Sequence, residues 1–229
     1  MPPDSNRAAA RDPVAAVLSS VVPGSGQALR GRIPQAAVAF LISAALLGCT
    51  WVIAQAHGGG AAAVLFLMIL VLPWWAIQSY DAWLAAQSPE AGLRQTLKVI
   101  WDRAHDVRYL GALFLLTALT DLYIIVANPG YSLTVFCTRP AGLLGALAKA
   151  QSPTLHILIG YGFLRLRRWS LLLYMAYAGF GLLNGSANYA CFGYGRVRTV
   201  FLVTLIAFTA YVFWRRRCFT APEAGPPRL

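Results

Sequence analysis

The sequence predicts an all-α polytopic membrane protein, a bundle of about six transmembrane helices with short surface helices. Apolar residues make up 58% of the 229 residues and charged residues only 12%, too few to cover a water-soluble globule of this size. Long uncharged runs recur along the whole chain and are separated by short clusters of arginine. We therefore expect lipid to be the solvent for most of the chain.

The first apolar stretch, residues 14–22, is predicted to be a short helix at the membrane surface. Asp12 and Pro13 are typical of a helix N-cap and first turn. The stretch is short, and a Pro-Gly turn follows it where a signal peptide would have small residues for cleavage. We therefore expect no signal peptide here.

The first two spans are predicted at residues 33–55 and 60–77. Pro34 is tolerated in the first turn of a helix, where its missing N–H would have no intrahelical partner. His57 and the glycines after it form the return between the two spans. Trp74 and Trp75 place the end of the second span at the level of the lipid headgroups.

Four further spans are predicted in the second half of the chain. The third covers residues 109–127, the fifth 169–189 and the sixth 199–214. The stretch between the third and fifth spans carries Lys149 and Pro153. We expect it to divide there, with an interfacial or re-entrant piece at 141–150 and a fourth span that begins at Ser152 and ends near residue 168.

The distribution of basic residues predicts that both chain ends lie in the cytoplasm. With six spans, most of the 19 basic residues fall on one side of the membrane, as positive cytoplasmic loops require. The four on the other side are Arg139, Lys149, Arg196 and Arg198. Because the basic residues stand in small groups at span ends, the net charge of +11 indicates contact with headgroups, and we expect no nucleic-acid partner.

A cytoplasmic amphipathic helix is predicted between the second and third spans. Ser88, Pro89 and Glu90 are typical of a helix start. Apolar and charged residues then alternate at helical spacing over residues 93–103. This helix is expected either to lie on lipid or to dock a cytoplasmic partner. The predicted regions are 1–86 (surface helix and two-span hairpin), 87–108 (cytoplasmic helix), 109–218 (four-span bundle) and 219–229 (disordered tail).

A motif before the first span resembles a known family. Its residues are Pro23, Gly24, Gly26, Gln27 and Gly31, with Asp81 after the helical hairpin. Over residues 12–86 this order resembles the bacterial two-transmembrane-helix domain family. The resemblance implies a bacterial membrane module without catalytic chemistry. Residues 160–169 are similar to a boundary between spans in small four-span bacterial membrane proteins of uncharacterised function.

The residues of this motif are expected to form a structural corner. Gly24 and Gly26 allow positive φ or a close approach of two backbones. Asp81 is predicted to accept hydrogen bonds from the glycine turn or to pair with Arg30 or Arg32, joining the two ends of the hairpin. A ligand or phosphate site at the glycine turn is the alternative.

Asp121 is the acidic residue predicted well inside a span, and it is the first candidate for function. Burying an isolated carboxylate in hydrocarbon is costly, so Asp121 is expected to have a partner or to be protonated. His156 and Lys149 are the candidate partners, and Asn184 and Asn188 are polar enough to line a small cavity. A structural pair between helices and a proton or ion relay through Asp121 and His156 both fit this pattern.

The cysteines predict one disulfide. Cys137 and Cys191 both fall on the outer side in the six-span topology, where a bacterial periplasm permits oxidation. The sequence contains no ligand spacing typical of a metal site, no phosphate loop and no catalytic constellation. We therefore expect no metal, no cofactor and no enzymatic activity.

Two functions fit these observations. The first is a non-enzymatic accessory or scaffold subunit of the bacterial inner membrane, with a membrane-protein partner or a homo-oligomer as its assembly. The second is a small channel or transporter in which Asp121, His156 and the polar end of the fifth span line a path.

Overall fold

The computed structural model describes residues 13–56, 59–84, 92–128, 130 and 132–220. Within those ranges the regular structure is helical, and an isolated β-bridge joins Val135 and Thr138. The chain divides into two compact units, Met1–Arg103 and Ala104–Leu229. The division falls inside the predicted region 87–108, so the described part of that region is shared between the two units.

The first unit begins with two short helices and a long one. α1 (Pro13–Val21) and α2 (Ser25–Leu29) precede α3 (Ile33–Gln55), which carries Pro34 in its first turn as the sequence predicted. α1 packs against α2 and against α5, with Ala15 and Ser19 buried. The helix predicted at 14–22 is thus present and is held by protein contacts on one side, and its place at the membrane surface stays a prediction.

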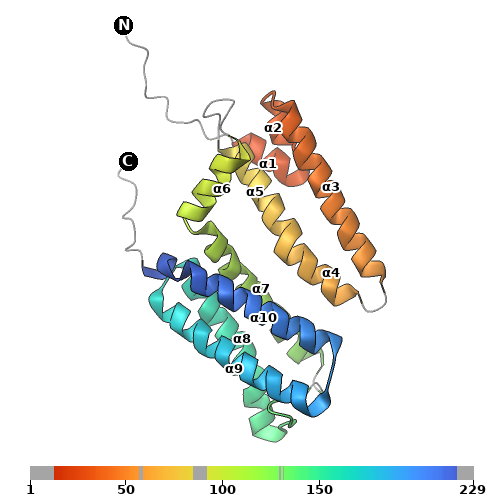
Figure 1. The fold of residues 1–229 in the computed structure, drawn as a ribbon, viewed down its shortest axis with the longest axis vertical. Helices are drawn as coiled ribbons and strands as arrows, with labels where there is room; N and C mark the ends of the chain where they lie inside the picture. The colour runs from red at the N-terminus through yellow and green to blue at the C-terminus, as the bar shows by residue number, and fades with distance from the viewer. Residues whose placement is uncertain (1–12, 57–58, 85–91, 129, 131, 221–229) are drawn as a thin grey trace. The chain divides into compact units, whose positions relative to one another are not determined.

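The second helix of the hairpin extends farther than predicted. α4 (Gly60–Phe66), a π-helical turn η1 (Leu67–Val71) and α5 (Leu72–Trp83) follow one another without a break, antiparallel to α3 (Figure 1). The wide π turn comes just before Pro73, whose ring crowds the preceding turn of a regular α-helix. The helix therefore continues past Trp74 and Trp75 and includes Asp81.

The amphipathic helix of the first unit is α6 (Leu93–Asp102). The start predicted at residues 88–90 lies outside the described residues. Thr96 of α6 is buried, while Leu93, Leu97 and Trp101 are exposed. Ala104 then adopts a left-handed backbone conformation, with φ of 52°, and this turn separates α6 from the next helix.

The second unit consists of long helices and a short closing turn. They are α7 (His105–Ala127), α8 (Gly142–Leu164), α9 (Arg168–Phe192), α10 (Arg196–Trp214) and the 3₁₀ turn η2 (Arg215–Thr220). α8 packs against α7 and α9, and α9 packs against α10 (Figure 1). Phe163, Tyr174 and Phe219 are fully buried at the centre of this bundle.

The break predicted at Ser152 and Pro153 is wrong, because α8 is continuous from Gly142 to Leu164. A proline inside a helix removes one backbone hydrogen bond, and neighbouring helices and hydroxyl side chains can compensate for that loss. Here Ser152 Oγ donates to Asp121 of α7, and Thr154 Oγ1 donates to the Ala150 carbonyl. Packing against α7 therefore outweighs the local preference for a helix boundary at Ser152 and Pro153.

Four helical segments among the described residues are long and apolar enough to cross a membrane, whereas the sequence predicted six. They are Ile33–Gln55, Ala62–Trp83, His105–Ala127 and Arg198–Phe219. α8 and α9 have 23 and 25 residues, but polar side chains such as Lys149, His156 and Asn188 interrupt their apolar character. The predicted all-α architecture with several helices able to cross a membrane is confirmed, and the number six is not.

Candidate functional site

The Asp121 carboxylate belongs to a polar network that links three helices of the second unit. Its Oδ2 atom lies 2.9 Å from His156 Nδ1 and accepts a hydrogen bond of 2.6 Å from Ser152 Oγ. His156 Nε2 lies 2.8 Å from Tyr177 Oη, so the imidazole bridges a carboxylate on α7 and a phenol on α9. Such partners offset the cost of placing a carboxylate within an apolar span. The same geometry suits a structural clamp and a proton-transfer step.

Aromatic rings pack around the imidazole end of this network. The ring centre of Phe114 lies 5.5 Å from that of His156 and 6.3 Å from that of Tyr177. Phe114 also meets Phe163 and Tyr174 edge-on, with ring centres 5.8 Å apart in both cases. Edge-on aromatic packing of this kind is favourable and rigid. The polar network therefore borders an aromatic core at its α9 end.

Two glycines allow α7 and α8 to approach closely enough for these contacts. A methyl group placed on Gly160 would lie 2.8 Å from the Gly111 carbonyl oxygen, and one on Gly111 would lie 2.8 Å from the Gly160 carbonyl oxygen. Small residues at a crossing are the usual way in which membrane helices gain close contact. The Gly111–Gly160 crossing thus sets the separation at which Asp121 and His156 meet.

The glycine turn of the first unit is a close-packed corner, as the sequence predicted. Gly24 has a φ of +88°, and a side chain there would collide with the Ala36 backbone. A side chain on Gly26 would collide with the Ala15 carbonyl. Gly31, with a φ of +74°, turns the chain from α2 into α3. The positive φ at Gly24 and Gly31 and the close backbone contact at Gly26 explain why glycine occupies the three positions.

Two buried glutamines join this corner to the end of α5. Gln27 Nε2 donates to the Gln78 carbonyl at 2.8 Å, and its Oε1 accepts from Ser19 Oγ at 2.9 Å. Gln78 Nε2 donates to the Ser19 carbonyl at 2.6 Å, and its Oε1 accepts from the Gly24 amide at 3.2 Å. The Gly26 amide donates to Ser19 Oγ at 2.9 Å. Both glycine amides are thus engaged within the protein, which disfavours the alternative of a phosphate site at this turn.

Asp81 joins α5 to the arginine at the entrance of α3 and to α6. Its Oδ2 lies 3.4 Å from Arg32 Nη1 and accepts from Gln27 Nε2 at 3.3 Å. Its Oδ1 accepts a hydrogen bond of 2.8 Å from Thr96 Oγ1. Of the two arginines considered as partners, Arg32 makes the ion pair, while Arg30 Nη1 donates to the Leu84 carbonyl. The two ends of the hairpin are therefore joined through Asp81.

The two cysteines predicted to pair are joined by a disulfide, with their Cα atoms 6.0 Å apart. The neighbouring asparagines of α9 hold the same loop. Asn184 Oδ1 accepts from the Phe136 amide at 2.7 Å, and Asn188 Oδ1 accepts from the Cys137 amide at 2.8 Å. Phe136 and Cys137 both have positive φ, which side-chain-bearing residues rarely adopt. The asparagines thus fasten a tight loop to α9.

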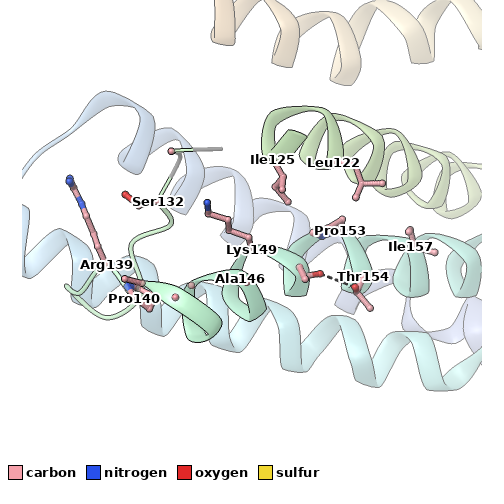
Figure 2. A pocket seen from close by; sticks show the side chains of 15 residues that line it. Leu122, Ile125, Ser132, Arg139, Pro140, Ala146, Lys149, Pro153, Thr154 and Ile157 are labelled. Carbon is pink, nitrogen blue, oxygen red and sulfur yellow. Dashed lines mark hydrogen bonds between the residues drawn. The ribbon is translucent and has the colours of Figure 1, made fainter. Parts of the chain in front are cut away.

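The remaining predicted polar residue, Lys149, lines a cavity of about 560 Å³ in the second unit. The cavity lies between the end of α7, the loop that follows it and the first half of α8 (Figure 2). Lys149 belongs to the same helix as Ser152 and His156. The cavity therefore begins next to the Asp121 network, with Pro153 in its wall.

A third polar cluster, which sequence reasoning missed, joins α7 to the chain after α10. Arg215 makes a two-pronged contact with Asp106, with Nε 2.7 Å from Oδ2 and Nη2 2.8 Å from Oδ1. Tyr211 Oη donates to Asp106 Oδ2 at 2.6 Å. A hydrogen bond between two charged groups, such as that from Nη2 to Oδ1, is stronger than one between neutral groups. Asp106 and Arg215 are far apart in the sequence, so no local pattern indicated this pairing.

Several other hydrogen-bonding side chains were not predicted either, although the sequence contained a signal for one of them. Ser19, Gln78 and Thr96 complete the glycine corner, and Ser152 and Tyr177 complete the Asp121 network. Gln78 is an uncharged polar residue in an apolar helix, and such residues mark contacts between helices. Gln78 could therefore have been predicted from the sequence by the criterion that singled out Asp121, a polar residue within an apolar helix.

Comparisons with known proteins return no match. No model of a known protein family matches the chain, and neither the search of curated proteins nor that of solved structures finds a similar protein. The resemblance to the bacterial two-transmembrane-helix domain family therefore stays a prediction.

Proposed function

We propose that this chain is a non-enzymatic accessory or scaffold subunit of a bacterial inner membrane and acts by association. The observation that carries the proposal is the orientation of α6. Thr96 fixes the helix to Asp81, and Leu93, Leu97 and Trp101 on another face are between 38% and 44% exposed. A docked helix with an exposed apolar stripe is a common contact surface for a partner.

The internal polar networks support the same proposal. Gln27 bonds both Gln78 and Asp81, and Gln78 accepts from the Gly24 amide. Asp121 accepts from Ser152, and its Oδ2 atom lies 2.9 Å from His156 Nδ1. Polar groups that bond each other within a membrane protein hold helices together. Their arrangement favours two internally rigid units that present surfaces to other molecules.

The proposed topology keeps six crossings with both chain ends in the cytoplasm. At 1.5 Å per residue, helices the length of α8 and α9 measure about 35 Å, enough for a hydrocarbon core of about 30 Å. Their polar side chains His156 and Asn188 bond partners inside the second unit, which lowers the cost of burying them. A crossing by α8 and α9 is therefore compatible with their composition.

The association proposal is tested by site-specific photo-crosslinking in native membranes. A photoreactive amino acid at Leu97 samples the exposed stripe of α6, and the same group at Asp102 samples an exposed polar position of that helix as a control. We expect Leu97 to give one protein adduct of defined mass, and Asp102 to give none. The same protein should remain bound at near-equal stoichiometry after purification in a mild detergent.

Adducts with lipid alone at Leu97, together with purification of the chain without a partner, would contradict the association proposal. In that case α6 lies on the membrane surface and serves as a connector between the spans.

A second candidate function, a small channel or transporter, is favoured by one observation. The carboxylate of Asp121, the imidazole of His156 and the phenol of Tyr177 follow one another at 2.9 and 2.8 Å, distances suited to proton transfer. Reconstitution into vesicles separates the two functions. Asp121→Asn should abolish proton or ion flux through a relay, whereas it should leave the bound partner of a scaffold in place.

A further inference from the structure

The cavity beside α8 is lined by basic residues in one part and by apolar residues in the other. Its volume of about 560 Å³ lies within the range typical of small-molecule sites. Arg139 and Lys149 line it, and among its described lining residues none is acidic. Asp121, next to the lining residue Leu122, turns its carboxylate to Ser152 and His156 instead. The cavity is therefore suited to an anion.

Both basic residues line the part of the cavity formed by the loop before α8 and the first half of α8. Figure 2 shows the side chains of Arg139 and Lys149 reaching to the same side of α8 as Ser132. Arg139 comes from the loop after α7, and Lys149 from the third turn of α8. A guanidinium, an ammonium and a hydroxyl are the donors that phosphate groups prefer in proteins.

The other end of the cavity is apolar. Leu122 of α7 lies near Ile157 of α8 there, and Ile125 of α7 lies over α8 between Lys149 and Pro153, as Figure 2 shows. Along α8, Ile157 lies eight residues beyond Lys149, a distance of about 12 Å at 1.5 Å per residue. The cavity is thus long enough to receive an anionic group at one end and several methylene groups at the other.

The position of the cavity along α7 indicates which of its two ends faces the acyl chains of the lipid. α7 is one of the helices able to cross the membrane, and Leu122 and Ile125 belong to its last two turns. Arg139 follows α7 in the chain and is exposed. The apolar end therefore faces the depth of the acyl chains, and the basic end faces the level of the headgroups.

The walls of the cavity are built from fixed elements. A methyl group on Gly145 would lie 2.5 Å from the Pro140 carbonyl, so glycine lets the loop rest directly on α8. The loop before Pro140 is fastened to α9 by the Cys137–Cys191 disulfide. A site held by two helices and a cross-linked loop is formed before its ligand arrives.

We propose that this cavity binds one anionic phospholipid, with the phosphate between Arg139 and Lys149 and part of an acyl chain along Leu122, Ile125 and Ile157. The phosphate is recognised by charge and hydrogen bonding. The acyl chain is recognised by apolar contact and continues into the bilayer.

The proposal is tested by native mass spectrometry of the full-length protein in a neutral detergent, titrated with dioleoyl phosphatidylglycerol. The expected result is saturable binding of one molecule per chain. Dioleoyl phosphatidylcholine should bind at least about tenfold more weakly, because its headgroup carries no net charge. Inorganic phosphate alone should not displace the lipid at millimolar concentration.

The variant Arg139→Gln/Lys149→Gln removes both cations and should weaken phosphatidylglycerol binding at least about tenfold. The matched control is Arg165→Gln/Arg168→Gln, which removes the same charge from exposed positions at the other end of α8 and the start of α9. This control should bind the lipid as the parent does. Ala146→Phe fills the cavity without changing its charge and should also weaken binding, while Leu147→Phe, outside the cavity lining, should not.

Three results would each overturn the proposal. The first is equal affinity of the parent and Arg139→Gln/Lys149→Gln for phosphatidylglycerol. The second is equal affinity of the parent for phosphatidylcholine, which would leave apolar contact alone. The third is displacement of the lipid by inorganic phosphate, which would make this a site for a free anion. Unchanged unfolding temperatures of Ala146→Phe and Leu147→Phe exclude misfolding as the cause of weaker binding.

Discussion

At the scale of single residues, the polar side chains around Asp121 are placed next to one another. Asp121 accepts from Ser152 and contacts His156, and the imidazole reaches Tyr177. In hydrocarbon no water is present to replace a lost partner, so each member of such a network depends on the rest. These contacts hold α7, α8 and α9 together, and they do so whether or not a proton moves from one side chain to the next.

The interaction of Asp121 with His156 is measurable by a double-mutant cycle. We expect Asp121→Asn and His156→Gln each to lower the free energy of unfolding by about 1–2 kcal/mol, because each leaves a buried partner unsatisfied. The double variant should cost less than the sum, with a coupling energy of about 0.5–2 kcal/mol. Unfolding in mixed micelles, followed by circular dichroism, gives these values.

Thr117→Val is the control for this cycle, because the Thr117 hydroxyl bonds the Leu113 carbonyl of its own helix. It should show no coupling with His156→Gln. Strict additivity of Asp121→Asn and His156→Gln would show that the contact contributes nothing to stability.

At the scale of elements, close approach between helix backbones decides which side chains meet. Gly111 and Gly160 let α7 and α8 cross at backbone contact distance, and Gly181 and Gly185 receive side chains of α10 on α9. Between membrane helices, van der Waals packing and interhelical hydrogen bonds supply much of the attraction. The close α7–α8 packing also explains why Pro153 does not end α8.

Replacing the glycine at the α7–α8 crossing should weaken the second unit. Gly160→Ala places a methyl group 2.8 Å from a backbone oxygen of α7, so the two helices must separate. We expect a loss of about 1–3 kcal/mol in the free energy of unfolding, as for overpacked cores. Gly179→Ala is the matched control, since a methyl group there meets nothing within 4 Å.

The same unfolding assay compares the two variants. Gly179→Ala should be as stable as the parent or slightly more so, because alanine favours helix more than glycine does. Equal stability of Gly160→Ala and Gly179→Ala would refute a close crossing at Gly111.

At the scale of the whole molecule, two units each have their own buried polar centre. The first is organised around Gln27, Gln78 and Asp81, and the second around Asp121 and His156. The proposed six-span topology assigns the disulfide of the second unit to the outer side and Cys218 to the cytoplasm. This assignment rests on the distribution of arginines and lysines.

Membrane-impermeant thiol labelling of intact cells tests that topology. In a Cys49→Ser background, Cys137 and Cys191 should react only after reduction, because their thiols are joined. Cys218 should remain unlabelled until the membrane is permeabilised. Ser132→Cys, which lies in the same loop as Cys137, should be labelled without reduction and serves as the positive control. Labelling of Cys218 from outside would reject the six-span arrangement.

The membrane class, most helix positions and the need for glycine at positions 24 and 26 follow from the sequence, because hydrophobicity and backbone sterics act over a few neighbouring residues. The sequence already offered His156 as a partner for Asp121, whereas the bond from Ser152 to Asp121, the pairing of Asp106 with Arg215 and the continuity of α8 through Pro153 required the tertiary structure. These features depend on contacts between helices that are distant in the chain. Such contacts can override a local signal, as packing against α7 does at Pro153, and no local pattern specifies them.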